Sequence, residues 1–225
     1  MIPLKDDNPS RTVPFVTIAF ILTNIAVFLW QLFLPGEAGA RAVLRLALVP
    51  ADLTGHAGDD APALLHTGTT LLTHMFLHGG VMHILGNMVY LWIFGNNVED
   101  LMGHGRFLVF YLICGLAAAL AQIAVFPRST VPMVGASGAV SGVLAAYLIL
   151  FPAARVLTLV FVFIFVRIVA VPAVIVLGLW FLIQLLNAGQ MQGAGVAWFA
   201  HIGGFVAGLL LVALFRRRRP RGSLF

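Results

Sequence analysis

Apolar residues gather in six long segments of this chain, separated by shorter stretches rich in polar residues, glycine and proline. A helix needs about 20 mostly apolar residues to cross the hydrocarbon core of a bilayer. The pattern therefore predicts an all-α integral membrane protein, a bundle of six transmembrane helices of which the fourth is short. The segments are residues 13–34, 81–94 with the following GNNVED, 107–126, 136–151, 171–186 and 196–215.

Two stretches do not fit this simple pattern. Residues 35–73 lack a long apolar run, but RAVLRLALVPADL within them is amphipathic and predicts a short helix lying at the membrane interface. Residues 155–186 are too long for one span and too short for two. Because proline disfavours helix at the preceding residue, Pro172 divides this stretch, and the pattern leaves the shape of residues 156–170 open.

Composition narrows the class of protein. Hydrophobic residues make up 61% of the chain and charged residues only 9%, whereas soluble domains carry about 25% charged residues. Lipid is therefore the expected solvent. The single cysteine, Cys114, lies in an apolar run and is interpreted as a small core residue.

The distribution of basic residues predicts how the chain is oriented in the membrane. Five of the basic residues stand in the last ten positions, RRRRPRGSLF, which indicates a topology anchor and not a nucleic-acid site. We expect a cytoplasmic tail at residues 1–12, one membrane domain at 13–215 and a basic cytoplasmic tail at 216–225. Six spans place both termini on one side, and the segments on that side hold nine basic residues against three on the other. Both termini are therefore predicted to be cytoplasmic.

Polar residues inside spans are costly and are the first functional candidates. They are His83 and Asn87 in the second span, Ser137 and Ser141 in the fourth, and His201 in the sixth. These three spans run in the same direction, and their polar residues lie near the outer ends. A serine, a histidine and two side-chain donors at one depth are the ingredients of acyl transfer.

Small residues accompany both candidate catalytic positions. GASGAVSG spaces Gly138 and Gly142 four apart, and AHIGGFVAG spaces Gly204 and Gly208 in the same way. Taken alone, each pattern indicates close helix packing and nothing more. Taken together, they predict that the fourth and sixth spans pack backbone to backbone, which would bring His201 within reach of Ser137.

The second span carries the candidate donors. His83 and Asn87 are four residues apart and share a helix face, and His78 lies just before the helix. A metal site is the alternative, but zinc prefers three or four His, Cys or carboxylate ligands, so no metal and no cofactor is expected. The outer halves of the spans hold no acidic residue. The sequence thus favours a Ser-His dyad whose histidine is oriented by packing or by another neighbour.

These motifs together resemble the rhomboid family of intramembrane serine proteases. GASG, AHxxG, H-x4-H-x3-N and FGNNVEDLMGHGRFLVFYLICG occur in order between about residues 71 and 215. The resemblance implies a six-helix rhomboid-like bundle with Ser137 and His201 as the catalytic dyad. It further implies that His83 and Asn87 form the oxyanion hole, that His78 supports them, and that Gly135 shapes the turn into the fourth helix.

The resemblance also implies partners and a location. Substrates would be single-pass membrane proteins cut near the outer membrane face through an acyl-enzyme, with the lipid bilayer as surroundings and without nucleic acid. The membrane would be a prokaryotic plasma membrane. The sequence does not give the natural substrate, the cut site, the regulation or the oligomeric state.

This sequence departs from the family pattern at two places. No tryptophan lies between Trp30 and Trp92, so the Trp-Arg pair common in the first loop is missing. In one branch of the family an aromatic residue lies four positions after the nucleophile, and here Ser141 takes that place. A hydrogen bond from Ser141 to His201 is our hypothesis for its role.

Two alternative functions stay open for this sequence. One is a catalytically inactive relative that binds membrane proteins, and the other is a small transporter or channel.

Overall fold

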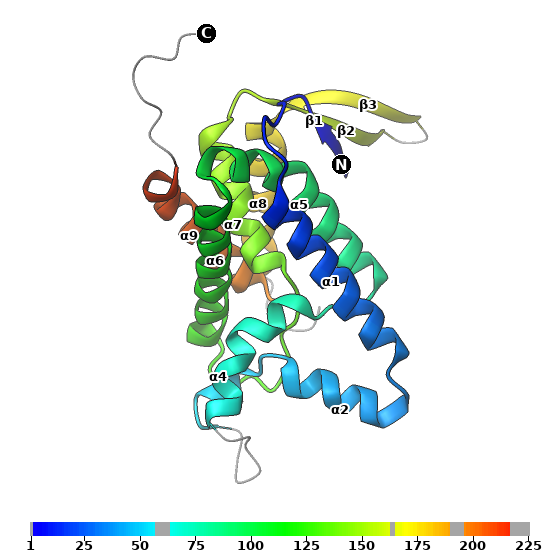
Figure 1. Ribbon diagram of the computed structural model, residues 1–225, viewed down its shortest axis with the longest axis vertical. Helices are drawn as coiled ribbons and strands as arrows, with labels where there is room; N and C mark the ends of the chain where they lie inside the picture. The colour runs from blue at the N-terminus through cyan, green and yellow to red at the C-terminus, as the bar shows by residue number, and fades with distance from the viewer. Residues whose placement is uncertain (1, 57–63, 163–164, 190–195, 217–225) are drawn as a thin grey trace.

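In the part of the chain that the structure describes, the six apolar segments each contain a helix, and these helices pack together (Figure 1). The computed structural model describes residues 2–56, 64–162, 165–189 and 196–216. Nearly all of the segment expected as a basic C-terminal tail, 216–225, lies outside these residues. The helices are α1 Phe15–Phe33, α5 Val81–Met102, α6 His104–Val125, α7 Ser137–Leu150, α8 Ala173–Ala188 and α9 Trp198–Phe215.

The bundle helices differ in how well their length matches a bilayer. Among the described residues, α1, α6 and α9 are each long and apolar enough to cross a membrane alone. Helix α5 meets the same test together with residues 68–76, at a bend of 86°. Helices α7 and α8 are apolar but shorter. The protein is therefore a mostly helical, multi-pass membrane protein, while the count of six spans stays a prediction.

The short helix α7 lies inside the bundle. It packs against α5, α6, α8 and α9, and ten of its residues, from Gly138 to Tyr147, are buried. A helix of 14 residues is about 21 Å long, less than the roughly 30 Å of a hydrocarbon core. Because protein and not lipid surrounds α7, its length need not match the bilayer, and one of its ends can lie below the membrane surface.

The segment between α1 and α5 forms short helices at one end of the bundle (Figure 1). Its elements are α2 Gly36–Leu46, α3 Pro50–Leu53, α4 Leu64–Thr73 and the 3-10 helix η1 His74–Phe76. The amphipathic helix predicted here is thus broken in two. Leu48, at the break, forms a β-bridge with Met133 of the α6–α7 loop, and Ala51 N–H donates to Ser129 O at 3.0 Å. Backbone hydrogen bonds thus join this first loop, which lacks the Trp-Arg pair, to the α6–α7 loop.

A three-stranded antiparallel sheet caps the opposite end of the bundle (Figure 1). The strands are β1 Ile2–Asp6, β2 Arg155–Val162 and β3 Phe165–Pro172, in the order β1-β2-β3. The prediction of an all-helical chain missed this sheet, and residues 156–170, whose shape the sequence left open, lie mostly in its β2–β3 hairpin. Pro172, expected to divide the stretch, ends β3 immediately before α8.

Asp6 joins the sheet to the bundle. Its Oδ2 accepts hydrogen bonds from the Tyr147 hydroxyl at 2.6 Å and from Asn97 Nδ2 at 2.8 Å. The Asp6 side chain is buried, and this burial raises its pKa above the ordinary value of 3.8, while the hydrogen bond from Tyr147 opposes the shift. Residues 2–6, expected to lie in a cytoplasmic tail, thus contact α5 and α7.

The N-terminus of α1 is capped by a carboxyl group from another helix. Glu99 of α5 accepts hydrogen bonds from the backbone N–H groups of Val16 and Thr17, at 2.9 and 2.8 Å, and from the Thr17 hydroxyl at 2.7 Å. The first N–H groups of a helix have no partner within the helix and carry partial positive charge. Glu99 satisfies two of them and so fixes the start of α1 against the last turn of α5.

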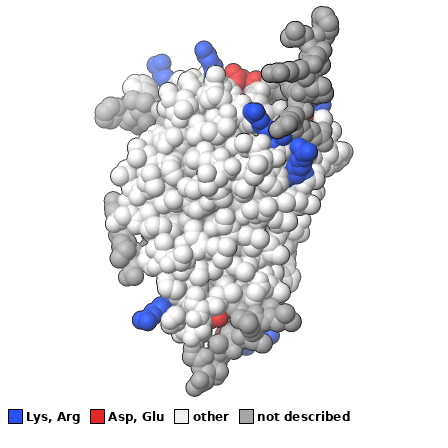
Figure 2. All heavy atoms as spheres, turned by 90° about the vertical axis from the view of Figure 1, so that its left-hand side faces the viewer, with Lys and Arg blue, Asp and Glu red and all other residues white. Residues whose placement is uncertain are grey.

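Charged side chains on the face shown in Figure 2 gather at the two ends of the molecule and leave the middle uncharged. The start of α6 and the end of α9 lie at the same end, because Arg106 Nη1 donates to Arg216 O at 3.5 Å. Strand β1 lies at that end too (Figure 1). An uncharged belt between two charged ends is the distribution expected for a protein that crosses a bilayer.

Candidate active site

Ser137 is the first residue of α7, and the loop before it is tightly held. Gly135 N–H donates to His74 O at 2.9 Å. Gly135 adopts a φ of +125°, and a Cβ there would lie 2.7 Å from Nε2 of His83. Glycine is therefore required at this position by both backbone conformation and space. The turn expected at Gly135 exists, and it places Ser137 at the free N-terminus of a helix.

His201 lies in the first turn of α9 and faces Ser137. Its Nε2 is 2.8 Å from Ser137 Oγ, although the two residues are 64 positions apart in the sequence. The distance is that of a hydrogen bond, and a nucleophile within such reach of a base is the arrangement needed for activation. The predicted meeting of the fourth and sixth spans at these two residues is present in the structure.

Backbone contact between α7 and α9 brings the pair together. A Cβ at Gly204 would collide with the carbonyl oxygen of Gly138, and a Cβ at Gly208 with the carbonyl oxygen of Gly142. The prediction that the two glycine patterns pack backbone to backbone is therefore confirmed. The packing of the helices and the pairing of Ser137 with His201 are one structural feature.

Gln184 of α8 contacts the other ring nitrogen of His201, and it was not among the residues expected in the site. Its Oε1 lies 2.8 Å from Nδ1 of His201, and its Nε2 donates to Trp180 O at 3.0 Å. Gln184 is only 5% exposed. The signal was available, because a lone polar residue in an apolar span is a functional candidate. Gln184 therefore lies where a neighbour that orients His201 would have to lie.

Two tryptophans pack around His201. The ring centroids of Trp180 and His201 are 6.0 Å apart with 35° between the planes, and Trp198 meets the imidazole edge-on at 5.9 Å. The hypothesis for Ser141 is wrong: its hydroxyl donates to Ser137 O at 2.6 Å and not to His201. The aromatic neighbours of the imidazole come from α8 and α9 instead of α7.

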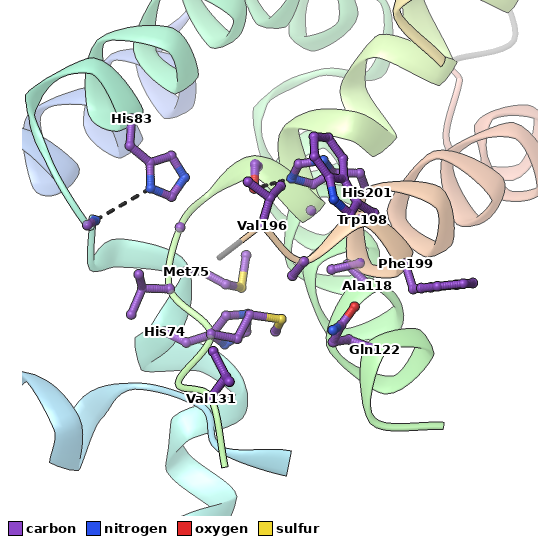
Figure 3. Close-up of a pocket in the computed structure, with 18 of the residues that line it drawn as sticks. His74, Met75, His83, Ala118, Gln122, Val131, Val196, Trp198, Phe199 and His201 are labelled. Carbon is purple, nitrogen blue, oxygen red and sulfur yellow. Dashed lines mark hydrogen bonds between the residues drawn. The ribbon is translucent and has the colours of Figure 1, made fainter. Parts of the chain in front are cut away.

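His83 and Asn87 line the same cavity as the Ser137–His201 pair, a hollow of about 1910 Å³ that opens to the surface. Figure 3 shows His83 and His201 on opposite sides of this cavity. Gly79 N–H lies 3.5 Å from His83 Nδ1, the accepting atom, which leaves Nε2 to carry the ring proton on the side of Gly135. The Nδ2 of Asn87 is buried and has no hydrogen-bond partner among the described residues.

His78 lies behind the cavity and does not line it. Its ring packs against His83 with centroids 5.1 Å apart and against Phe28 at 6.5 Å. Gln31 Oε1 accepts from its backbone N–H at 3.0 Å, but its ring nitrogens have no partner in the part of the chain that the structure describes. The position fits support of the His83 ring by packing and offers no direct contact with Ser137.

The chemistry available in the cavity is that of a neutral serine-histidine pair. Among the described residues, no three His, Cys, Asp or Glu side chains come together in a way that could hold a metal ion. The described residues that line the cavity include no Asp or Glu. A hydroxyl, an imidazole and free N–H donors can carry out acyl transfer from these positions.

Comparison with known proteins gives one consistent result. The family model called Rhomboid domain matches residues 66–218. RHOMBOID-like protein 4 of Arabidopsis thaliana is 33% identical over 217 residues, 88% of this chain and 52% of that protein. Rhomboid protease GluP of Bacillus subtilis is 44% identical over 78 residues, 35% of this chain and 15% of that protein.

A mitochondrial relative extends the range of organisms. Rhomboid protein 1 of Saccharomyces cerevisiae is 29% identical over 154 residues, 63% of this chain and 40% of that protein. This chain spans about half the length of the longest-matching relatives, 52% of one and 58% of another. The matched Rhomboid domain, residues 66–218, includes Ser137, His201, His83 and Asn87.

Proposed function

Because this chain belongs to the rhomboid family, we propose that it is an intramembrane serine endopeptidase in which Ser137 is the nucleophile and His201 its base. The observation that supports this proposal most is the 2.8 Å contact between Ser137 Oγ and His201 Nε2 inside an open cavity. A binding-only relative has no need of that contact. The substrate would be a transmembrane segment of another membrane protein.

The proposed reaction has two stages. His201 Nε2 takes the proton of Ser137 while Oγ bonds to the scissile carbonyl carbon. The C–N bond then breaks as His201 returns the proton to the leaving amine, which leaves an acyl-enzyme. In the second stage a water molecule gives its proton to His201 and attacks the ester, and Ser137 regains its proton. The open cavity offers a route for that water.

The oxyanion of each tetrahedral intermediate would be bound by donors on two helices. Asn87 Nδ2 and His83 Nε2 reach the cavity from α5. The start of α7 adds backbone N–H groups that have no partner within the helix. Such donors are aligned before the reaction begins, and each is typically worth about 3–4 kcal/mol of transition-state stabilisation.

The substrate would reach the site from within the membrane. Exposed backbone groups are costly in lipid, so a substrate helix has to unwind near the cavity, which favours weak helices near the outer membrane face. Helix α8 presents exposed Leu182 and Leu186 to its surroundings and carries the wall of the cavity that includes Gln184. We propose that the substrate enters laterally beside α8. We also propose that the protein lies in a prokaryotic plasma membrane with both termini in the cytoplasm.

Fluorophosphonate labelling of the purified protein tests the function without knowledge of a substrate. We expect the wild type to label, and Ser137→Ala and His201→Ala to lose labelling. Ser141→Ala is the matched control, since its hydroxyl is one turn away, buried, and bonded only to Ser137 O among the described atoms. Folded wild type that neither labels nor cuts a transmembrane peptide in lipid would instead indicate a binding-only relative.

A further inference from the structure

We propose that Gln184 is the positioning residue of the catalytic histidine, taking the place that a carboxylate has in a Ser-His-Asp triad and tying the base to helix α8. The inference rests on the proposed function. It starts from one contact, the 2.8 Å between Gln184 Oε1 and His201 Nδ1. Gln184 is 5% exposed, whereas its neighbours along α8, Ile183 and Leu185, are each 44% exposed. The amide therefore faces the bundle from a helix whose adjacent positions face outward.

The orientation of the amide follows from its second partner. Gln184 Nε2 lies 3.0 Å from the carbonyl oxygen of Trp180, one turn earlier on α8. A carbonyl oxygen can only accept, so the NH2 group has to face Trp180. The opposite orientation would place two acceptor oxygens against each other. The atom that faces His201 is consequently the amide oxygen.

The amide oxygen in turn sets the tautomer of the imidazole. An amide oxygen only accepts, so Nδ1 of His201 must carry a proton to bond with it. In the neutral ring, Nε2 is then the unprotonated nitrogen, and Nε2 is the atom that lies 2.8 Å from Ser137 Oγ. That tautomer is the one that can accept the serine proton. The chain from Trp180 O to Ser137 Oγ has one consistent set of donors and acceptors.

A glutamine differs from a carboxylate in what it supplies. It holds the tautomer and the ring orientation, but it carries no charge to stabilise the imidazolium that forms during the reaction. The described residues that line the cavity include no acidic side chain that could supply this charge. His83 of α5 faces His201 across the cavity, and the other described titratable or charged residues that line it are His74, Tyr90 and Arg128. We therefore infer a base that is aligned by α8 but not made more basic by it.

The location of Gln184 gives this alignment a further consequence. Both Gln184 and Trp180, which packs on the imidazole, belong to α8, whereas Ser137 and His201 belong to the tightly packed pair α7 and α9. A displacement of α8 would leave the serine and the histidine in contact but remove the acceptor from Nδ1. Without that acceptor, His201 can carry its proton on Nε2, and in that form Nε2 cannot accept the proton of Ser137. Full activity thus requires α8 to be in place against α9.

The test is a substitution of Gln184 by the near-isosteric methionine, assayed with a transmembrane peptide. We expect Gln184→Met to lower kcat roughly 10-fold to 100-fold while KM changes less than about twofold. The matched control is Asn24→Leu. Asn24 is also a buried helix amide that donates to the carbonyl four residues earlier, at 2.7 Å from Phe20 O, but it lies in α1 away from the dyad. The control should keep wild-type kcat.

A second variant separates alignment of the base from simple support of the fold. Gln184→Glu places a carboxylate beside Nδ1, which favours the protonated imidazolium and raises the pKa of the base. The acidic limb of kcat/KM should therefore move to higher pH than in the wild type, with His83 common to both proteins. If Gln184 only supported the fold, the acidic limb of kcat/KM would stay at the wild-type pH.

The outcomes distinguish this inference from the proposed function. If wild type shows serine-dependent activity and Gln184→Met retains wild-type kcat, or if the acidic limb of Gln184→Glu does not move, Gln184 is not a positioning residue while the protease function stands. If the wild type shows no activity that Ser137→Ala removes, the proposed function itself fails. Reduced kcat in Gln184→Met with a shifted limb in Gln184→Glu supports the inference.

Discussion

Asn87 contributes a side-chain amide to the lining of the cavity. Its Nδ2 is buried, and none of the described residues accepts a hydrogen bond from it. Leaving a buried donor without a partner typically costs about 1–3 kcal/mol of stability. A group that is costly to the fold and lies in a reactive cavity is well explained as a donor for a charge that exists only during the reaction.

Replacement of Asn87 should therefore separate activity from stability. We expect Asn87→Leu to lower kcat about 100-fold or more, because one oxyanion donor is lost, while the unfolding midpoint stays the same or rises. Peptide cleavage and thermal unfolding in the same detergent measure the two effects. Asn24→Leu provides the comparison, and a variant of Asn87 with wild-type kcat would remove this residue from the proposed oxyanion hole.

Single residues were predictable where the motif and the topology agreed. Ser137 and His201 stand near the same ends of parallel spans, so their meeting followed from helix direction and from glycine spacing. Gln184 was not found, although a glutamine in an apolar run is itself a signal, because the run does not show which face of α8 turns toward the bundle. Ser141 was misjudged for a related reason: a serine in a helix often bonds its own backbone four residues earlier, as it does here.

Among the elements, the crossing of α7 and α9 leaves the least room for change. Gly204 lies against the backbone of Gly138, and an added methyl group would overlap the Gly138 carbonyl. Backbone does not move aside as a flexible side chain can, so the two helices would have to separate. Because Ser137 and His201 lie on these helices, their contact would lengthen with the separation.

Gly204→Ala should lower both stability and activity. Overpacking of this kind costs about 1–3 kcal/mol, which should appear as a lower unfolding midpoint, together with reduced fluorophosphonate labelling. Gly178→Ala in α8 is the control, since a Cβ there meets nothing within 4 Å, and alanine in place of a helical glycine is neutral or slightly stabilising. Equal midpoints for the two variants would contradict the close packing described here.

The helices of the bundle were predictable from apolar segment length, but the sheet was not. Residues 155–172 are as apolar as the spans around them, so hydrophobicity alone could not distinguish a membrane helix from a hairpin. Their richness in Val, Ile and Phe favours strands, yet the pairing of β1 with β2 joins residues about 150 positions apart. Such pairing forms only when the folded bundle brings the two strands together, so the residues on either side of each strand do not predict it.

At the scale of the whole molecule, the first and last described elements lie at the same end of the bundle. Strand β1 and the end of α9 share one end of the bundle, and the α6–α7 loop lies at the other with α2 and α3. This arrangement agrees with an even number of spans, while the count of six and the side of the termini stay predictions. The asymmetry of basic residues then favours a cytoplasmic location for the end that carries the sheet.

Cysteine labelling tests this orientation. The native Cys114 is buried with no exposed surface, so Arg11→Cys and Arg128→Cys each add one accessible thiol at opposite ends. A membrane-impermeant maleimide should label Arg128→Cys in intact cells and Arg11→Cys only after the membrane is opened. The chain with Cys114 alone should stay unlabelled in both conditions. Labelling of Arg11→Cys in intact cells would reverse the proposed orientation.

The contact of Glu99 with the start of α1 has a consequence for how this protein is made. A ribosome finishes α1 long before it adds Glu99, which is 82 positions later than Thr17. Until α5 has been synthesised and inserted, the N–H groups of Val16 and Thr17 lack the acceptor that Glu99 provides and need water or lipid headgroups. The N-terminus of the nascent α1 must therefore stay at the membrane surface during translation, and its final docking comes only after α5 arrives.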